Sequence, residues 1–201
     1  MLKLPKATEV SKQLAKKAIY GKFSLTTAEK ERFDESVKKL TIVNEILPSS
    51  INLAESENLP AFYVVEVSLK QKDYDAAIVE KILKLINQKM IWVLEFENDA
   101  QIMVLHGKLI RSPWQAKESL EIKLKGLNIS QAWESVVQQI GNVQIEQGKT
   151  LDEQLAINEA RSKLQKQIDA LKKKAWAEKQ PKKKFAYAQE LKVLERQLEE
   201  L

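Results

Sequence analysis

Apolar positions in the first part of the chain change from a helical spacing to a strand-like one. A helix over about 27–39 is predicted, because Thr26 and Glu29 match a capping box and apolar residues follow at three- and four-residue intervals. Those apolar residues are Phe33, Val37 and Leu40. The β-rich stretch 41–47 predicts a strand, and Pro48 ends it because proline cannot extend a ladder.

The next segment has the densest strand pattern in the chain. Residues 61–69 read AFYVVEVSL, rich in β-branched and aromatic side chains. Asp73 is then expected to be the N-cap of a helix that runs to about Asn87. Its apolar residues cover so much of its surface that it must be mostly buried across a sheet. They are Ile78, Val79, Ile82, Leu83, Leu85 and Ile86.

Three more strands and a helix are predicted before residue 147. Strands over 90–96 and 101–105 flank the turn 97–100 and read as a hairpin. Apolar residues alternate with charged ones over 120–124, which predicts a half-exposed strand that ends at Gly126. A helix follows, with Ser130 as its cap, Gly141 as its end, and an inner face of Trp133, Val136, Val137 and Ile140.

The predicted order of elements is α-β-β-α-β-β-β-α. Strands that follow one another without crossover helices indicate a mixed or mostly antiparallel sheet. We therefore expect an α+β body over residues 1–147, with about five strands, helices packed on them, and a basic N-terminal arm.

From residue 148 the composition changes to lysine, glutamate, glutamine, alanine and leucine, which is typical of long solvated helices. Two heptad seams lie on either side of Pro181, a residue that suits the first turn of a helix. The seams are Ile157, Leu164, Ile168, Leu171 and Ala175, then Tyr187, Leu191, Leu194, Leu198 and Leu201. They predict helices over about 150–178 and 182–201 in a lysine-rich antiparallel hairpin, residues 148–201. A kinked helix that pairs with another chain, including a homo-oligomer, is the alternative.

Charge is distributed unevenly over these parts. Residues 1–22 have a net charge of +5, residues 23–147 of −4, and residues 148–201 of +4. Basic ends on an acidic body indicate contact with a polyanion, or a match of charges within or between subunits.

The chain contains few groups for catalysis. It has no cysteine, a single histidine, His106, and no glycine-rich phosphate loop, so no cofactor and no metal ion is expected. Glu66, Glu95 and Glu97 lie on predicted neighbouring strands and could bind Mg²⁺ in a divergent nuclease. Solvated strand faces carry such residues routinely, which is the structural alternative.

The most distinctive local feature is a cluster of lysines and aromatic residues at the predicted tip of the hairpin. Its candidate binding residues are Lys172, Lys173, Lys174, Trp176, Lys179, Lys182, Lys183, Lys184 and Phe185. Lysines can pair with phosphates and release counterions, and aromatic rings can stack on unpaired bases. The alternative is a solvated helix end whose aromatic side chains pack across the hairpin.

The chain resembles a bacterial family known as the domain of unknown function four-three-nine-one. The similarity rests on residues 4–10, 47–53, 65–70 and 125–128, and on the final basic helix rich in leucine and glutamate. The resemblance implies a small companion of helicases and DNA methyltransferases in restriction or phage-defence neighbourhoods, and it carries no catalytic residue. The chain departs from the family at Leu14-Ala15, where relatives often have Ile-Pro, and at Pro181.

These observations lead to three hypotheses. The first is a non-enzymatic accessory subunit whose body binds a larger helicase or methyltransferase and whose basic hairpin contacts either that partner or nucleic acid. The second is a direct nucleic-acid-binding module, and the third is the metal-dependent nuclease. The N-terminus lacks the apolar segment of a secretory signal and no apolar run is long enough to span a membrane, so a cytoplasmic protein is expected.

Overall fold

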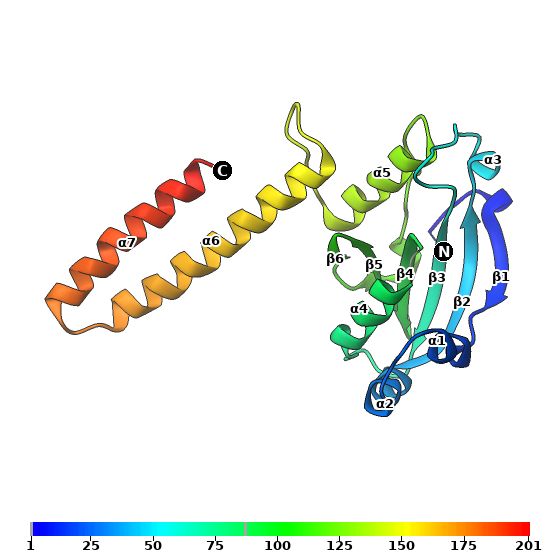
Figure 1. The fold of residues 1–201 in the computed structure, drawn as a ribbon, viewed down its shortest axis with the longest axis horizontal. Coiled ribbons are helices and arrows are strands. Elements are labelled where there is room, and N and C mark those ends of the chain that lie inside the picture. The colour runs from blue at the N-terminus through cyan, green and yellow to red at the C-terminus, as the bar shows by residue number, and fades with distance from the viewer. Residues whose placement is uncertain (1, 87) are drawn as a thin grey trace. The chain divides into compact units, whose positions relative to one another are not determined.

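The computed structural model describes residues 2–86 and 88–201, which fold as two compact units, Met1–Val143 and Gln144–Leu201. The first unit is an α+β body, and the second contains the C-terminal helices α6 (Leu151–Ala177) and α7 (Pro181–Glu199) (Figure 1). The predicted α+β class and the helical hairpin are both confirmed.

The body is built on one mixed sheet, in which the described residues form seven strands instead of the predicted five or so. The order is β1-β2-β3-β4-β5-β6, with β7 also paired to β5. Only β3 and β4 run parallel among the described pairs, because helix α4 (Ala76–Leu85) crosses between them. The strands are β1 (Glu9–Gln13), β2 (Val37–Ile46), β3 (Phe62–Leu69), β4 (Met90–Phe96), β5 (Asp99–His106), β6 (Lys108–Arg111) and β7 (Gln115–Ala116).

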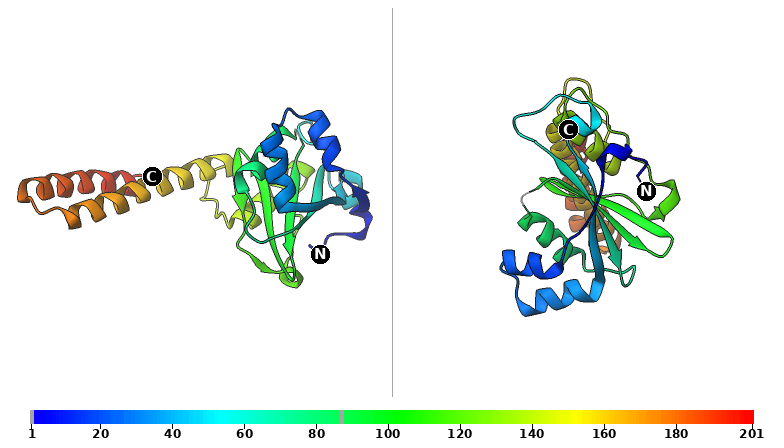
Figure 2. Two further views of the ribbon diagram at one scale, coloured as in Figure 1. Left: turned by 90° about the horizontal axis from the view of Figure 1, so that it is seen from below. Right: turned by 90° about the vertical axis from the view of Figure 1, so that its right-hand side faces the viewer.

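Helices cover both faces of this sheet (Figure 2). On one face α4, α1 (Lys16–Lys22) and α2 (Thr27–Ser36) share a core with inward residues of β3 and β4 such as Val67 and Trp92. On the other face α5 (Ile129–Gly141) packs through Trp133, whose ring meets Phe62 edge to face at 5.4 Å. The predicted inner face of α5 is buried as expected. Short helical turns complete the body at η1 (Lys6–Thr8), α3 (Pro48–Ile51) and η2 (Lys117–Ser119).

The helix predicted over 27–39 is too long, although its capping box is present. Helix α2 ends at Ser36, and Val37 begins β2. Val37 and Leu40 are both buried because the register of β2 on β3 shifts between Val37 and Lys39. That irregularity brings two residues three apart to the same face, so a bulged strand imitated helical spacing.

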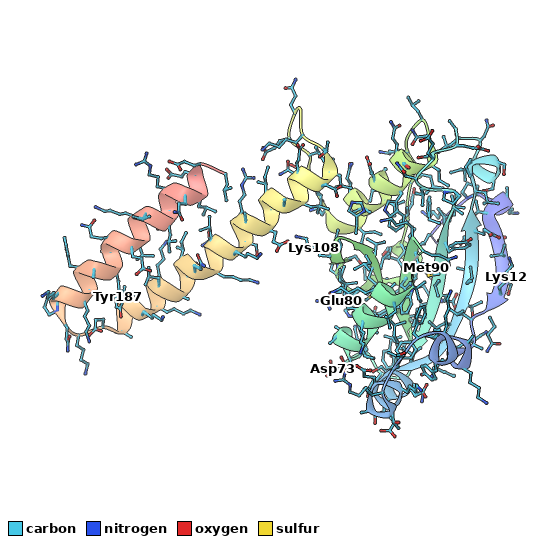
Figure 3. All side chains as sticks on the ribbon, in the orientation of Figure 1. Lys12, Asp73, Glu80, Met90, Lys108 and Tyr187 are labelled. Atoms are coloured by element: carbon cyan, nitrogen blue, oxygen red, sulfur yellow. The ribbon has the colours of Figure 1, made fainter. Side chains whose placement is uncertain are left out.

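Two predicted helix starts are also corrected. Asp75, not Asp73, caps α4, and its Oδ1 accepts from the amides of Ala77 and Ile78. Asp73 lies in the preceding loop (Figure 3). Asn128, not Ser130, caps α5, because its Oδ1 accepts from the amide of Gln131 at 2.9 Å.

The predicted end of α5 at Gly141 is confirmed. Helix α4 ends at Leu85, and the predicted end at Asn87 lies outside the described residues. Gly141 is the last residue of α5, and Asn142 forms the left-handed C-cap with a φ of 47°. Either residue type can adopt that conformation, so the sequence did not distinguish them.

The strand predicted over 120–124 is wrong. Leu120 and Ile122 are buried, as their alternation indicated, but this segment pairs with no strand of the described sheet. The amide of Ile122 donates instead to the carbonyl of Leu2 at 3.1 Å. Alternation reports a buried face, but a strand also needs a neighbouring backbone to pair with.

Candidate functional site

The lysines and aromatic residues singled out in the sequence gather at the closed end of the α6–α7 hairpin. Helix α6 begins with a capping box between Thr150 and Glu153 and runs to Ala177. One carboxylate oxygen of Glu178 accepts from the amides of Lys179 and Gln180, at 2.8 and 2.9 Å, and this fixes the connection. Pro181 then starts α7 at its first helical position. We call residues 172–186 the hairpin tip.

All nine predicted binding residues lie at the tip and are exposed. The tip contains seven lysines against one acidic residue, Glu178, so it has a net charge of +6. Residues 144–201 as a whole have a net charge of only +3, with 13 basic and ten acidic residues. The positive charge of this unit is therefore concentrated at its tip.

Helix α7 extends past the end of α6 at the tip (Figures 1 and 2). The first six residues of α7, from Pro181 to Ala186, are all exposed. Partial burial begins at Tyr187, labelled in Figure 3, and recurs at the predicted seam residues Leu191, Leu194 and Leu198. The seams are therefore confirmed, and the first turns of α7 stand clear of them.

One tip lysine is used within the hairpin. Lys172 Nζ lies 2.8 Å from Glu195 Oε1 across the two helices, and this hydrogen bond raises the pKa of the Lys172 amine. Among the residues that the structure describes, the side chains of the other tip lysines make no ion pair or hydrogen bond. These are Lys173, Lys174, Lys179, Lys182, Lys183 and Lys184. The backbone amide of Gln180 and the nearby charge of Lys183 together lower the pKa of the Glu178 carboxyl.

The basic N-terminal arm behaves differently from the tip. Lys3, Lys12 and Lys16 pair with Glu121, Glu45 and Asp34 of the body, at 2.9, 3.4 and 2.6 Å. The Tyr20 hydroxyl donates to the same Asp34 oxygen, Oδ1, as Lys16 does, at a distance of 2.8 Å. Half of the arm's six lysines are thus matched within the body, whereas most tip lysines have no such match.

Helix electrostatics do not account for the lysines at the start of α7. Lys172, Lys173 and Lys174 lie near the C-terminus of α6, where a positive charge interacts favourably with the helix dipole. Lys182 and Lys183 lie in the first turn of α7, where the dipole is repulsive to cations and no acidic residue is present. These lysines are therefore placed at a cost to local helix stability.

The two tip aromatics do not pack across the hairpin, which overturns that part of the structural alternative. Trp176 is 89% exposed and Phe185 is 67% exposed. Trp92 and Trp133 of the body, by contrast, are at most 3% exposed. Burying a ring of this size is favourable by a few kcal/mol at roughly 25 cal/mol per Å², so an exposed tryptophan indicates a contact surface.

A groove between the two helices passes along Trp176. Its walls are Lys172, Ala175 and Trp176 from α6, with Lys184 and Leu191 from α7, and they enclose about 530 Å³. The floor is apolar and a lysine stands on each helix. Sequence reasoning missed the roles of Ala175 and Leu191 here because both read as seam residues, and it had no signal for Glu195.

The candidate carboxylates of the body are not gathered into a three-ligand site. Glu66 and Glu95 lie on neighbouring strands, but Glu97 is in the turn after β4 with a φ of 53°. Glu95 Oε2 accepts from Lys117 Nζ at 2.5 Å. Within the described residues, no group of three or more histidine, cysteine, aspartate or glutamate side chains could hold a metal ion.

His106 has a structural environment at the end of β5. Its Nδ1 accepts a hydrogen bond from Trp133 Nε1 at 3.2 Å, which joins β5 to α5. The Lys89 amine lies over the Trp133 ring, 5.6 Å from its centre. This histidine therefore helps to fix Trp133.

Comparison with known proteins identifies the family. Residues 2–198 match the family described as "Domain of unknown function (DUF4391)". The chain belongs to this family. No curated protein and no solved structure matches it. Among the residues described, none of the helices combines the length and the apolar character needed to cross a membrane.

Proposed function

We propose that this protein is a non-enzymatic accessory subunit that binds nucleic acid through its hairpin tip. The observation that carries the proposal is the set of six exposed tip lysines without an ion-pair partner among the described residues, beside exposed Trp176 and Phe185. A flexible ammonium group is a good ligand for phosphate, and aromatic rings bind bases.

A polyanion relieves the unfavourable features of the tip. Phosphates near the start of α7 offset both the mutual repulsion of the lysines and their repulsion by the helix dipole. Each phosphate neutralised also releases condensed counterions, which makes affinity fall with salt and depend little on base sequence. The Lys172–Glu195 pair holds one lysine in place across the hairpin without neutralising the others.

The accessory part of the proposal concerns the body. Residues 1–143 have a net charge of only +2, with 20 basic and 18 acidic residues, so the body attracts a phosphate backbone far less than the tip does and is left to a protein partner. The resemblance noted in the sequence supports a larger helicase or DNA methyltransferase in a restriction or phage-defence system. We expect the protein to co-purify with such a partner from the native host. If it purifies without any partner protein, this part of the proposal is contradicted.

The test measures salt-dependent binding of labelled oligonucleotides by fluorescence anisotropy. We expect log Kd to rise linearly with log salt concentration for the natural protein. Replacing six tip lysines by glutamine should reduce the slope by several units, at about 0.7–0.9 per phosphate contact. The six are Lys173, Lys174, Lys179, Lys182, Lys183 and Lys184, so the Lys172–Glu195 pair of the hairpin is kept.

A control variant removes the same charge from the body. Its substitutions to glutamine are at exposed Lys6, Lys17, Lys38, Lys39, Lys70 and Lys125. This control should keep both the affinity and the slope. Equal weak binding by the natural protein and both variants would contradict the proposal. If instead a host protein binds the natural protein and the control variant but not the tip variant, the tip is a protein-docking surface.

A further inference from the structure

The groove at the tip combines an aromatic ring with lysines, and neutralising charge by itself would require only the lysines. Lys172 and Trp176 are four residues apart on α6, so their side chains share one helix face, and Ala175 lies beside them. Lys184 and Leu191 are seven apart on α7 and also share a face. An indole therefore forms one wall of an apolar channel, and an ammonium group stands on each helix beside it.

This arrangement fits a nucleotide whose base is free to leave the stack. Lys184 can bind a phosphate that flanks it, while Lys172 is paired with Glu195 and the base lies on the exposed indole. Stacking tolerates every base because each has a π-face, which agrees with a groove that presents few hydrogen-bonding side chains.

A duplex fits the same groove poorly. Its bases are already stacked on one another, so a side chain at its surface meets phosphates, sugars and base edges. The indole would then lie against a charged backbone without a base to cover it. Lysines alone would suffice for a duplex, and Trp176 and Phe185 would have no role.

Phe185 supplies a second ring outside the groove. It follows Lys184 in the exposed first turns of α7, so it projects from a different side of that helix. Because stacking needs only an exposed ring, Phe185 can bind a further base of a strand that continues beyond Lys184.

We infer that the tip binds unpaired nucleotides of single-stranded nucleic acid, with Trp176 as the main stacking residue and Lys184 as a phosphate ligand, while Glu195 holds Lys172 at the groove. The inference rests on the proposed function and names its substrate class. A bound single strand would cover the exposed tryptophan with a base, and its phosphates would be complementary in charge to the surrounding lysines.

The test compares a short single-stranded oligothymidylate with a blunt duplex of the same length, using the full chain. We expect the single strand to bind more tightly and to quench tryptophan fluorescence. Trp92 and Trp133 are buried and Trp114 is partly buried, so loss of the quenching in Trp176→Leu assigns it to Trp176. Trp176→Leu keeps an apolar side chain but removes the ring. It should weaken single-strand binding on the order of tenfold and leave duplex binding unchanged.

Val193→Ala is the matched control, because Val193 is an exposed apolar residue of α7 that does not line the groove. It should change neither affinity. Equal or tighter binding of the duplex, or an unaltered single-strand affinity in Trp176→Leu, would overturn this inference while the proposed function stands. Absence of salt-dependent binding to either nucleic acid would overturn both.

Discussion

Glu95 and Lys117 show how a single buried charge depends on its partner. Glu95 is 9% exposed, and its Oε1 is buried without a hydrogen-bond partner among the described residues. Burial raises the pKa of the Glu95 carboxyl, the hydrogen bond from Lys117 lowers it, and the nearby charge of Glu66 raises it. The net pKa lies above the ordinary value of 4.5, so Lys117 only partly offsets the cost of burial.

We predict that Lys117→Met destabilises the body at neutral pH by roughly 1–3 kcal/mol, because it leaves a buried carboxylate unpaired. The folded-state pKa of Glu95 is raised, so the folded protein binds this proton more tightly than the unfolded chain does. The stabilisation from protonation is complete below 4.5 and is lost as the pH rises through the folded-state value. The defect should therefore shrink as the pH falls towards 4.5, measured by urea unfolding across this range.

Lys123→Met is the surface control for that experiment. Lys123 Nζ lies 3.6 Å from Glu121 Oε1 in an exposed pair, which contributes little to stability. A change of no more than about 0.5 kcal/mol is expected at any pH. An equal loss in both variants would contradict the importance of burial at Glu95.

At the scale of elements, the two helices of the hairpin place like charges at opposite helix ends. Lys174 lies in the last turn of α6, and Lys182 lies in the first turn of α7. The helix dipole stabilises the first and destabilises the second. The same residue type therefore has opposite effects on its helix within one tip.

We predict that Lys182→Glu raises the stability of the hairpin and that Lys174→Glu lowers it, each by about 0.3–1 kcal/mol at low salt. The two substitutions change the net charge equally, so each is the control for the other. Thermal melting followed by circular dichroism at low and high salt would measure both. Shifts of the same sign would show that overall charge, and not the position in the helix, decides stability.

On the scale of the whole molecule, the two units differ in how much apolar surface they bury. The body buries apolar side chains on both faces of its sheet, whereas none of the described residues of α7 is buried. Local stability follows such differences, because regions with few buried apolar contacts open at low free energy. The hairpin tip is expected to be the least protected part of the helical unit.

We predict that amide hydrogen exchange is fast over residues 178–186 and slow in β3 and β4. Added single-stranded oligonucleotide should slow exchange at the tip and leave the sheet unchanged, because ligand that binds only the ordered tip stabilises it. Mass spectrometry of peptic peptides would show this. Protection that appears in the body instead would place the nucleic-acid site there.

Features that depend on neighbouring residues in the chain were determined by the sequence alone. Strand β4 was predicted at its observed bounds, and the capping box of α2 and Pro181 at the start of α7 were anticipated, because their causes lie within a few residues. The family motifs and the nine tip residues were equally accessible. The role of those nine residues stays a prediction.

Tertiary structure decided what depends on distant partners. Two outcomes depend on which backbone lies beside the segment. Strand β2 pairs with β3 through a bulge that gives its buried residues a helix-like spacing, and the segment with Leu120 and Ile122 has no strand to pair with. The exposure of Phe185 likewise follows from its place in the first turns of α7, which pass the end of α6. Local pattern reports which residues can be buried, and only the packed chain decides which of them find a partner.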